Sequence, residues 1–426
     1  MSKKIDLKEA VSIGVGGMVG GGIFAVLGLA VTLAKGATPL AFLMAGFLAL
    51  ITAYSYAKLS VKYPDSGGTV RFVNEGFGKN IFSGAINNLL WVSYIIMLGL
   101  YASAFGSYAP NLFVLFSKEI DFHIYASAVI ILATVINYYS IEVVGKIESI
   151  AVFVKLIILI AFIGVSVYGL TQANQLSQLS PADWESPLTI LSGGMVIFVA
   201  YEGFELIANS APDVENPSVN VPRAYYISVG FVVLLYVIIA FVTVGSLTFE
   251  KIKEAEEYVL ASAARPMLGQ VGFTVMTIAA LISTFSAINA SLYGGSRVSY
   301  EIAEDDELPH QLTAQFWNQP VGLIITTVAT LILVNTLELE SISTAGSIGF
   351  LLVFATVNYS GFKLADKISG NKWLPMSGFI LCIIALVALI QQEFTDNKTG
   401  VLVAAGIVLI CFVAETVYKK TEKSKA

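Results

Sequence analysis

A cluster of glycines near the start of the chain is the first candidate ligand-binding segment. It spans Gly16–Gly22 (GGMVGGG), inside an apolar stretch from about residue 7 to residue 34. Consecutive glycines are costly within a helix, but they let backbone N–H groups approach an anion closely. A half-helix that starts near Ile23 would also direct the positive end of its dipole at that anion. The predicted carboxylate-binding residues are Val19, Gly20, Gly21, Gly22 and Ile23.

Two other interpretations of the glycine cluster are weaker. The pairs Gly16/Gly20 and Gly17/Gly21 have the GxxxG spacing of a close helix contact, but three consecutive glycines make a poor helix. A nucleotide-binding loop needs a preceding strand and GxGxxG spacing, and the sequence has neither.

A second apolar stretch, from about residue 188 to residue 209, is interrupted at Tyr201–Glu205 (YEGFE). If a half-helix ends at Tyr201, its last carbonyl groups are free to accept hydrogen bonds from an ammonium group. A carboxylate that meets N–H groups and an ammonium that meets C=O groups together describe an α-amino acid. Phe198 is a candidate lid, and an ordinary core aromatic is its alternative. The predicted residues of this half of the site are Phe198, Val199, Ala200, Tyr201, Glu202 and Glu205.

Glu202 and Glu205 are acidic residues in an apolar segment. A carboxylate at membrane depth costs about 2.5 kcal/mol or more, so it usually faces a cavity or a partner. Protonation, a basic partner, and hydrogen bonds from Ser, Tyr or Lys neighbours are all open. Both residues are candidates for substrate binding or for coupling.

Lys155 lies in an apolar run with no other charge between Glu148 and Asp183. Its long side chain has the option of reaching a membrane interface. Alternatively, desolvation favours the neutral form of a buried lysine, which would let it carry a proton. Further along the chain, Ser283 and Ser286 offer hydroxyl oxygens for sodium or for the Lys155 ammonium, or bond back to their own helix.

The composition is that of a membrane protein. Of 426 residues, 56% are hydrophobic and 13% are charged, and the mean hydropathy is +0.78. A soluble protein of this length cannot hide so much apolar surface. The net charge of −6 gives no basic footprint for nucleic acid. No cofactor, metal site or obligatory protein partner is expected.

The apolar pattern predicts twelve spans in one transmembrane domain. The first and sixth are broken, and the third and eighth are longer than a span needs. This pairing predicts two five-helix repeats of inverted topology, at about 7–170 and 188–364, followed by extra helices at 373–418. The spans are 7–34, 39–60, 80–110, 123–140, 146–170, 188–210, 223–247, 270–301, 320–337, 341–364, 373–391 and 399–418.

The distribution of basic residues predicts the orientation. With the N-terminus inside, seventeen Lys and Arg fall on the inner side and six on the outer side, so both termini are expected in the cytoplasm and the protein in the cell membrane. Two connecting segments are expected to be helical, one at 64–79 on the inner side and an amphipathic one at Lys251–Ala264 on the outer side.

The chain resembles the amino acid–polyamine–organocation (APC) transporters over essentially its whole length, and three motifs carry this resemblance. They are the glycine break with Ile23-Phe24, the segment Phe198–Glu205, and Glu215-Asn216-Pro217 followed by Val221–Ala224. Among members of this family, the chain resembles the proton-coupled amino acid transporter ApcT. The resemblance implies the LeuT-type fold, with ten core helices plus two.

The resemblance also implies roles for single residues. The glycine amides would hold the substrate carboxylate, and the carbonyls of the sixth span its amine. Lys155 would occupy the space that sodium fills elsewhere, next to the backbone near Gly16 and to Ser283 or Ser286. Glu202 and Glu205 depart from ApcT, where the aligned residues are uncharged, and this departure leaves the charge class of the substrate open.

The resulting prediction is a secondary active transporter that imports amino acids by proton-coupled alternating access. The alternatives are a cationic amino acid or polyamine transporter or an exchanger on the same fold, and an amino acid sensor that does not transport. An enzyme is not expected, because no GxSxG, HExxH or Walker A motif occurs.

Overall fold

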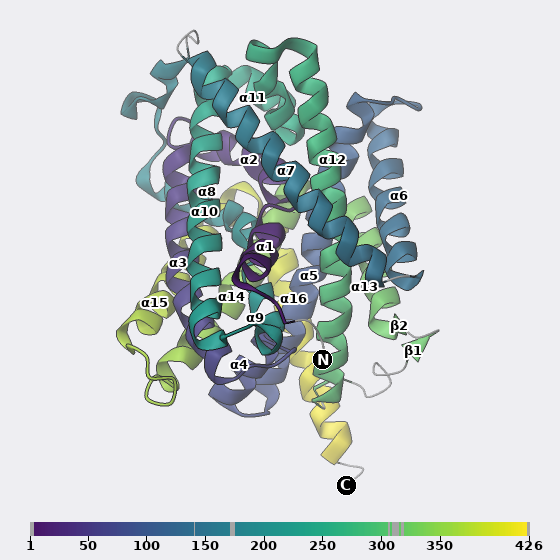
Figure 1. Ribbon diagram of the computed structural model, residues 1–426, viewed down its shortest axis with the longest axis vertical. Coiled ribbons are helices and arrows are strands. Elements are labelled where there is room, and N and C mark those ends of the chain that lie inside the picture. Colours follow the sequence, from purple (N-terminus) through teal and green to yellow (C-terminus); the bar gives the residue numbers. More distant parts are fainter. Residues whose placement is uncertain are drawn as a thin grey trace.

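The computed structural model describes residues 4–139, 141–170, 175–305, 307–308, 315–316 and 319–423. Apart from the two-residue antiparallel strands β1 (Gln315–Phe316) and β2 (Gln319–Pro320), the regular elements of this part of the chain are helices. Figure 1 shows most of them running along one direction, with the two ends of the chain toward the same end of the bundle. The small helix α4 (Thr69–Phe77) lies at that end, and α11 (Phe249–Ala255) lies at the other.

Within the described ranges, ten helical segments are long and apolar enough to cross a membrane, and one further broken pair passes the same test. An all-helical, polytopic membrane architecture is thereby confirmed. The broken pair is α1 (Leu7–Met18) and α2 (Gly22–Ala34), bent by 45°. The others are α3 (Thr38–Lys62), α5 (Ile81–Tyr108), α6 (Lys118–Tyr139), α7 (Ile141–Leu170), the segment Pro187–Asp213, α10 (Pro217–Ser246), α12 (Val259–Glu304), α14 (Leu339–Lys363), α15 (Trp373–Asp396) and α16 (Lys398–Lys423).

One predicted span corresponds to a shorter helix. The stretch 320–337 forms α13 (Val321–Thr336), which has 16 residues, fewer than the roughly 20 of a typical span.

The predicted start of α10 at 223 is six residues late, because Pro217 is accepted at the first helical turn.

The first break is narrower than predicted. Only Val19–Gly21 separates α1 from α2, whereas the prediction placed the break at Gly16–Gly22. Gly16 and Gly17 belong to α1, and Gly17 allows close packing there. A β-carbon on Gly17 would lie 2.7 Å from the carbonyl oxygen of Gly203.

The second break lies where it was predicted. Helix α8 (Pro187–Val196) continues as the 3-10 helix η4 (Ile197–Tyr201), and residues 202–205 form a turn before α9 (Leu206–Ser210) and η5 (Ala211–Asp213). Within the turn, Gly203 has a φ of 113°, a conformation that side-chain-bearing residues rarely adopt.

The predicted helix at 64–79 is confirmed as α4, but the predicted outer helix at Lys251–Ala264 is wrong in extent. It consists of α11, the 3-10 helix η6 (Glu256–Tyr258) and the first turns of α12. Helix α12 itself is interrupted at Gly269, whose φ is 59°. The expected span 270–301 begins just after this kink.

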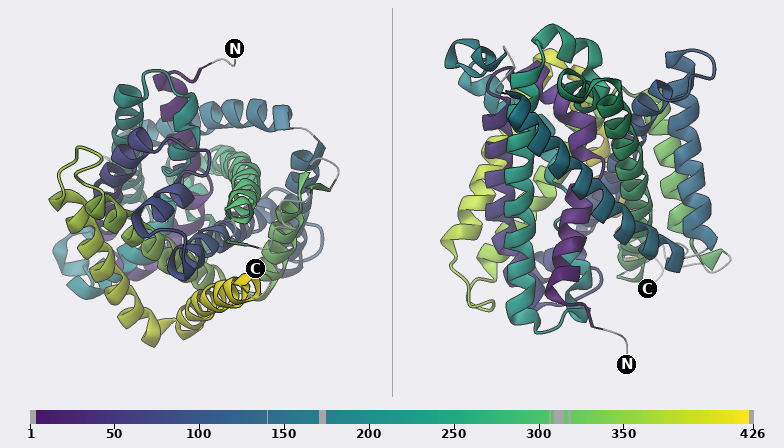
Figure 2. Two further views of the ribbon diagram at one scale, coloured as in Figure 1. Left: turned by 90° about the horizontal axis from the view of Figure 1, so that it is seen from below. Right: turned by 45° about the horizontal axis from the view of Figure 1, so that its top comes forward.

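The centre of the bundle is formed by α5, α14 and the second broken segment. In each of them, 89% of an apolar stretch of 18 residues is buried in the protein. Helices α6 and α16, with 28%, and α15, with 33%, lie at the periphery. Figure 2 shows α15 and α16 on one side of the bundle, and α7 crossing it obliquely next to α1. The two breaks therefore lie in the most protected part of the protein.

Candidate functional site at the two helix breaks

The two breaks are in direct backbone contact. Gly17 packs on Gly203, and Gly22 packs on Ala200, whose Cα would lie 2.9 Å from a β-carbon at position 22. Gly20 meets Ala287 of α12 in the same way, at 2.7 Å. The glycine cluster thus brings the unwound stretches together because no side chain stands between them.

Side chains from other helices satisfy the carbonyl groups of the first break. The Tyr236 hydroxyl donates to the Met18 carbonyl at 2.6 Å. The Ser283 hydroxyl donates to the carbonyls of Val19, at 3.0 Å, and of Gly20. Because α2 begins at Gly22, the N–H groups of its first turn have no partner within the helix. This polarity suits an anion.

The second break is fixed by hydroxyl groups from α14. Ser343 and Ser347 both donate to the Val196 carbonyl at 2.8 Å, and the Val199 N–H donates to Ser347 at 3.2 Å. The Val199 carbonyl accepts from the N–H of Glu202 at 3.2 Å, so this oxygen is already used. The 3-10 helix then ends at Tyr201, whose own hydroxyl donates to Phe42. The carbonyls at the end of η4 are therefore the acceptors that remain for an ammonium group.

Lys155 reaches this region from α7. Its ammonium donates to the Gly16 carbonyl at 3.1 Å, and the residue is 0% exposed. A side chain buried in this way does not reach the membrane interface, which removes that alternative. Lys155 and Ser283 therefore bind neighbouring carbonyls of the same stretch from α7 and α12, and Ser286 is buried on α12 one turn from Ser283.

Both glutamates of the second break are buried, Glu202 to 3% and Glu205 to 1% exposure. Glu202 accepts a hydrogen bond from the Tyr101 hydroxyl at 3.2 Å. Glu205 accepts one from Tyr94 at 3.2 Å and one from the Gly203 N–H at 2.8 Å. Of the environments considered for these residues, the structure shows tyrosine partners.

Tyr101 and Tyr94 were not predicted as site residues. The Tyr101 ring lies directly on Gly21, with its Cγ 2.8 Å from the place of a β-carbon, while its hydroxyl holds Glu202. One side chain of α5 thus contacts both breaks. The sequence contains 19 tyrosines, and no spacing distinguishes these two.

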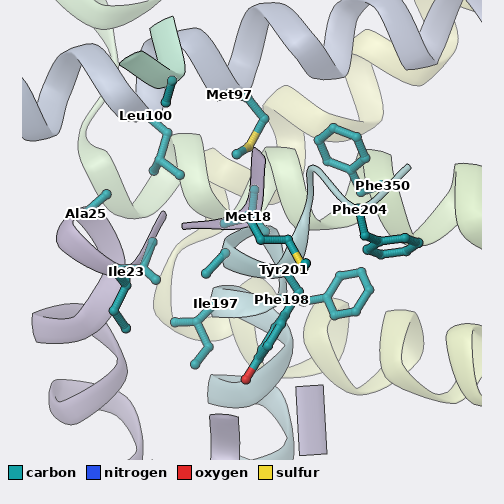
Figure 3. Close-up of a cluster of buried hydrophobic side chains, with 14 of the residues drawn as sticks. Met18, Ile23, Ala25, Met97, Leu100, Ile197, Phe198, Tyr201, Phe204 and Phe350 are labelled. Carbon is teal, nitrogen blue, oxygen red and sulfur yellow. The ribbon is translucent and has the colours of Figure 1, made fainter. Parts of the chain in front are cut away.

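Phe198 lies in an aromatic cluster. Its ring meets Phe354 of α14 edge-on, with centroids 5.8 Å apart, and it is 1% exposed. Figure 3 shows Met18, Phe198, Tyr201, Phe204 and Phe350 among the buried hydrophobic side chains of the core. This packing is that of a core aromatic, the alternative to a lid.

A separate cavity of about 550 Å³ lies near the α11 end of the bundle. Ser107, His123, Glu257 and Asn335 are among its lining residues, and Glu257 accepts a hydrogen bond from Ser107. Burial raises the pKa of Glu257, against the effect of that bond. These contacts tie η6 to the end of α5.

Comparison with known proteins finds a matching family model and several similar chains. A family model described as amino acid permease matches residues 5–414. An uncharacterized protein of Methanocaldococcus jannaschii is 32% identical, and the inner membrane transport protein YbaT of Escherichia coli is 30% identical. Each alignment covers 99% of this chain and 97% of the relative. The serine/threonine exchanger SteT of Bacillus subtilis is 27% identical over 72% of this chain and 70% of its own length. YbaT is described as a transport protein and SteT as an exchanger, and the expectation that the chain is not an enzyme is confirmed.

Proposed function

Because the chain belongs to the amino acid permease family, we propose that it imports amino acids across the cell membrane together with protons. Membership itself establishes a multi-pass transporter of amino acids or related small molecules. Proton coupling is the proposal, and one observation carries it. The buried Lys155 ammonium bonds to the Gly16 carbonyl beside the first break, and loss of its proton would weaken this charge-assisted bond.

We propose the LeuT-type architecture for this chain, and several features of the fold support it. The breaks at Val19–Gly21 and at residues 202–205 lie at the centre of the bundle, and they meet through Gly17 and Gly203. Counting α13 as the ninth span gives twelve, with repeats at about 7–170 and 188–364 and extra helices α15 and α16. The two termini lie toward the same end of the bundle, which supports a cytoplasmic location for both. The similarity to ApcT belongs to this proposal.

In the proposed binding mode, the substrate carboxylate faces the N–H groups of Gly21, Gly22 and Ile23 at the start of α2. Its ammonium faces the carbonyls of Ala200 and Tyr201 at the end of η4. The positive end of one half-helix and the negative end of the other match the two charges of an amino acid. In the described conformation, Tyr101 covers Gly21, so substrate entry requires this ring to move.

In the proposed cycle, one group of helices rocks against another and exposes the breaks to each side in turn. Protonated Lys155 holds the Gly16 carbonyl, and the deprotonated amine no longer donates the same charge-assisted bond. The energy of the proton gradient enters the cycle through this difference.

A cationic substrate or an exchange mode is the second candidate. Glu202 and Glu205 place two carboxyl groups at the second break, where they can attract the extra positive charge of a cationic substrate. The relative SteT carries the description serine/threonine exchanger, which favours testing exchange directly.

The test is uptake into proteoliposomes of labelled alanine, arginine, glutamate and putrescine. Each is measured with an inward proton gradient, with an inward sodium gradient, with neither, and with preloaded unlabelled substrate. Accumulation driven by protons alone is the expected result. Accumulation that requires sodium, or flux only against preloaded substrate, would overturn proton symport.

A further inference from the structure

Glu202 and Glu205 lie three residues apart in the turn at the second break, and Tyr101 and Tyr94 of α5 donate a hydrogen bond to one each. Two neighbouring carboxyl groups repel each other when both are ionised, so a proton on one of them is favoured. Both residues are almost completely buried, which makes two adjacent negative charges still more costly.

The surrounding donors indicate which carboxyl holds the proton. Glu205 uses both oxygens as acceptors, one for the Tyr94 hydroxyl and one for the Gly203 N–H. Glu202 accepts a single bond, from Tyr101. Hydrogen bonds to the ionised form stabilise it, so Glu205 is the better-stabilised carboxylate and the proton belongs on Glu202.

No basic side chain neutralises the pair in the part of the chain that the structure describes, because none of its ion pairs includes either glutamate. The titratable groups that face it are phenols, which are neutral near pH 7. They are Tyr94 and Tyr101 on α5, Tyr56 on α3 and Tyr225 on α10. Lys155, the basic group at the breaks, donates to Gly16.

We propose that Glu202 and Glu205 form a proton-binding site separate from Lys155, in which one proton resides on Glu202 and Glu205 is ionised. The pair then carries a single negative charge next to the carbonyls that would receive a substrate ammonium. This inference deepens the proposed function and rests on it only for the identity of the arriving cation. The proton occupancy itself depends on neither a substrate nor a gradient.

Infrared difference spectroscopy of the full-length protein in lipid nanodiscs tests the occupancy at neutral pH. The C=O stretching band of a protonated carboxyl group, shifted in heavy water, is recorded for the wild type and for Glu202→Gln. The expected result is a band component that the variant lacks. An identical spectrum for both proteins would overturn the proposal.

Two matched tyrosine variants assign the proton without removing either acid. Tyr101→Phe deletes the donor to Glu202, so the C=O band should shift to higher wavenumber. Tyr94→Phe deletes a donor to Glu205 and should leave the position of that band unchanged. A shift in Tyr94→Phe alone would place the proton on Glu205 and overturn the assignment. Failed uptake in proteoliposomes would count against the proposed function and would leave the infrared result as it stands.

Discussion

Gly17 of α1 and Gly203 between η4 and α9 pack backbone against backbone, although 186 positions separate them in the sequence. The contact leaves no room for a β-carbon on either residue. It holds the two unwound stretches together, so that N–H groups at the start of α2 and carbonyls at the end of η4 face one small region. Lys155, Tyr101 and Ser283 reach that region from three other helices.

Replacement of Lys155 by alanine should abolish uptake driven by a proton gradient and leave substrate binding partly intact. The variant loses the ammonium that bonds to the Gly16 carbonyl, while the residues proposed to bind substrate remain. Uptake and equilibrium binding are compared in the same preparation, with Lys253→Ala on the exposed face of α11 as the control. Gradient-driven uptake at the wild-type level in Lys155→Ala would remove this residue from the mechanism.

Replacement of Gly21 by valine should weaken substrate binding by at least about tenfold, or about 1.4 kcal/mol. The new side chain would take the place of the proposed carboxylate and collide with the Tyr101 ring. Scintillation proximity binding with labelled substrate measures the affinity. Gly230→Val is the matched control, because a β-carbon at that position meets nothing within 4 Å. If Gly21→Val binds as the wild type does, the carboxylate site lies elsewhere.

Several parts of this site could be predicted from the sequence because they are locally anomalous. Three consecutive glycines in an apolar segment, and a single lysine in a long apolar run, are visible without any partner. The break at residues 202–205 is visible because two glutamates and a glycine interrupt an apolar segment. The roles of these residues remain proposals, but their placement near the two breaks follows from the contacts of Gly16, Gly17 and Lys155.

Other features depend on contacts between distant residues, and the sequence does not reveal them. Tyr101 meets Glu202 across 101 positions, and Tyr236 meets Met18 across 218. The limits of the first break were wrong because a glycine that permits close packing looks the same as one that unwinds a helix. The prediction separated the outer helix that ends at 264 from the span that begins at 270, whereas α12 joins these residues across the kink at Gly269.

Replacement of Glu202 by glutamine should spare neutral substrates and weaken basic ones, by about tenfold for arginine, which corresponds to about 1.4 kcal/mol. The wild-type carboxyl pair can release its proton to match an extra positive charge, whereas the amide of glutamine cannot. Competition of alanine and arginine with a labelled substrate measures both affinities. Glu250→Gln, on the exposed surface of α11, is the control. An equal loss for alanine and arginine would reduce Glu202 to a structural role.

The last prediction concerns Glu307, which follows α12 near the α4 end of the bundle. Its carboxylate accepts hydrogen bonds from Asn87 at 2.6 Å and Ser83 at 3.2 Å, and the residue is 0% exposed. Burial raises the pKa of Glu307, and these hydrogen bonds oppose the shift only in part. Since the folded-state pKa lies above the unfolded value, this group stabilises the fold at low pH. That contribution is lost as the pH rises through the folded-state pKa.

The thermal unfolding midpoint of the wild type in detergent should therefore fall more steeply than that of Glu307→Gln as the pH rises above the ordinary glutamate pKa of about 4.3. Glu250→Gln should keep the wild-type slope, because its side chain is exposed. If Glu307→Gln has the same slope as the wild type, the Glu307 carboxyl group does not change its protonation on folding. Its bonds to α5 would then stabilise the protein equally at every pH in this range.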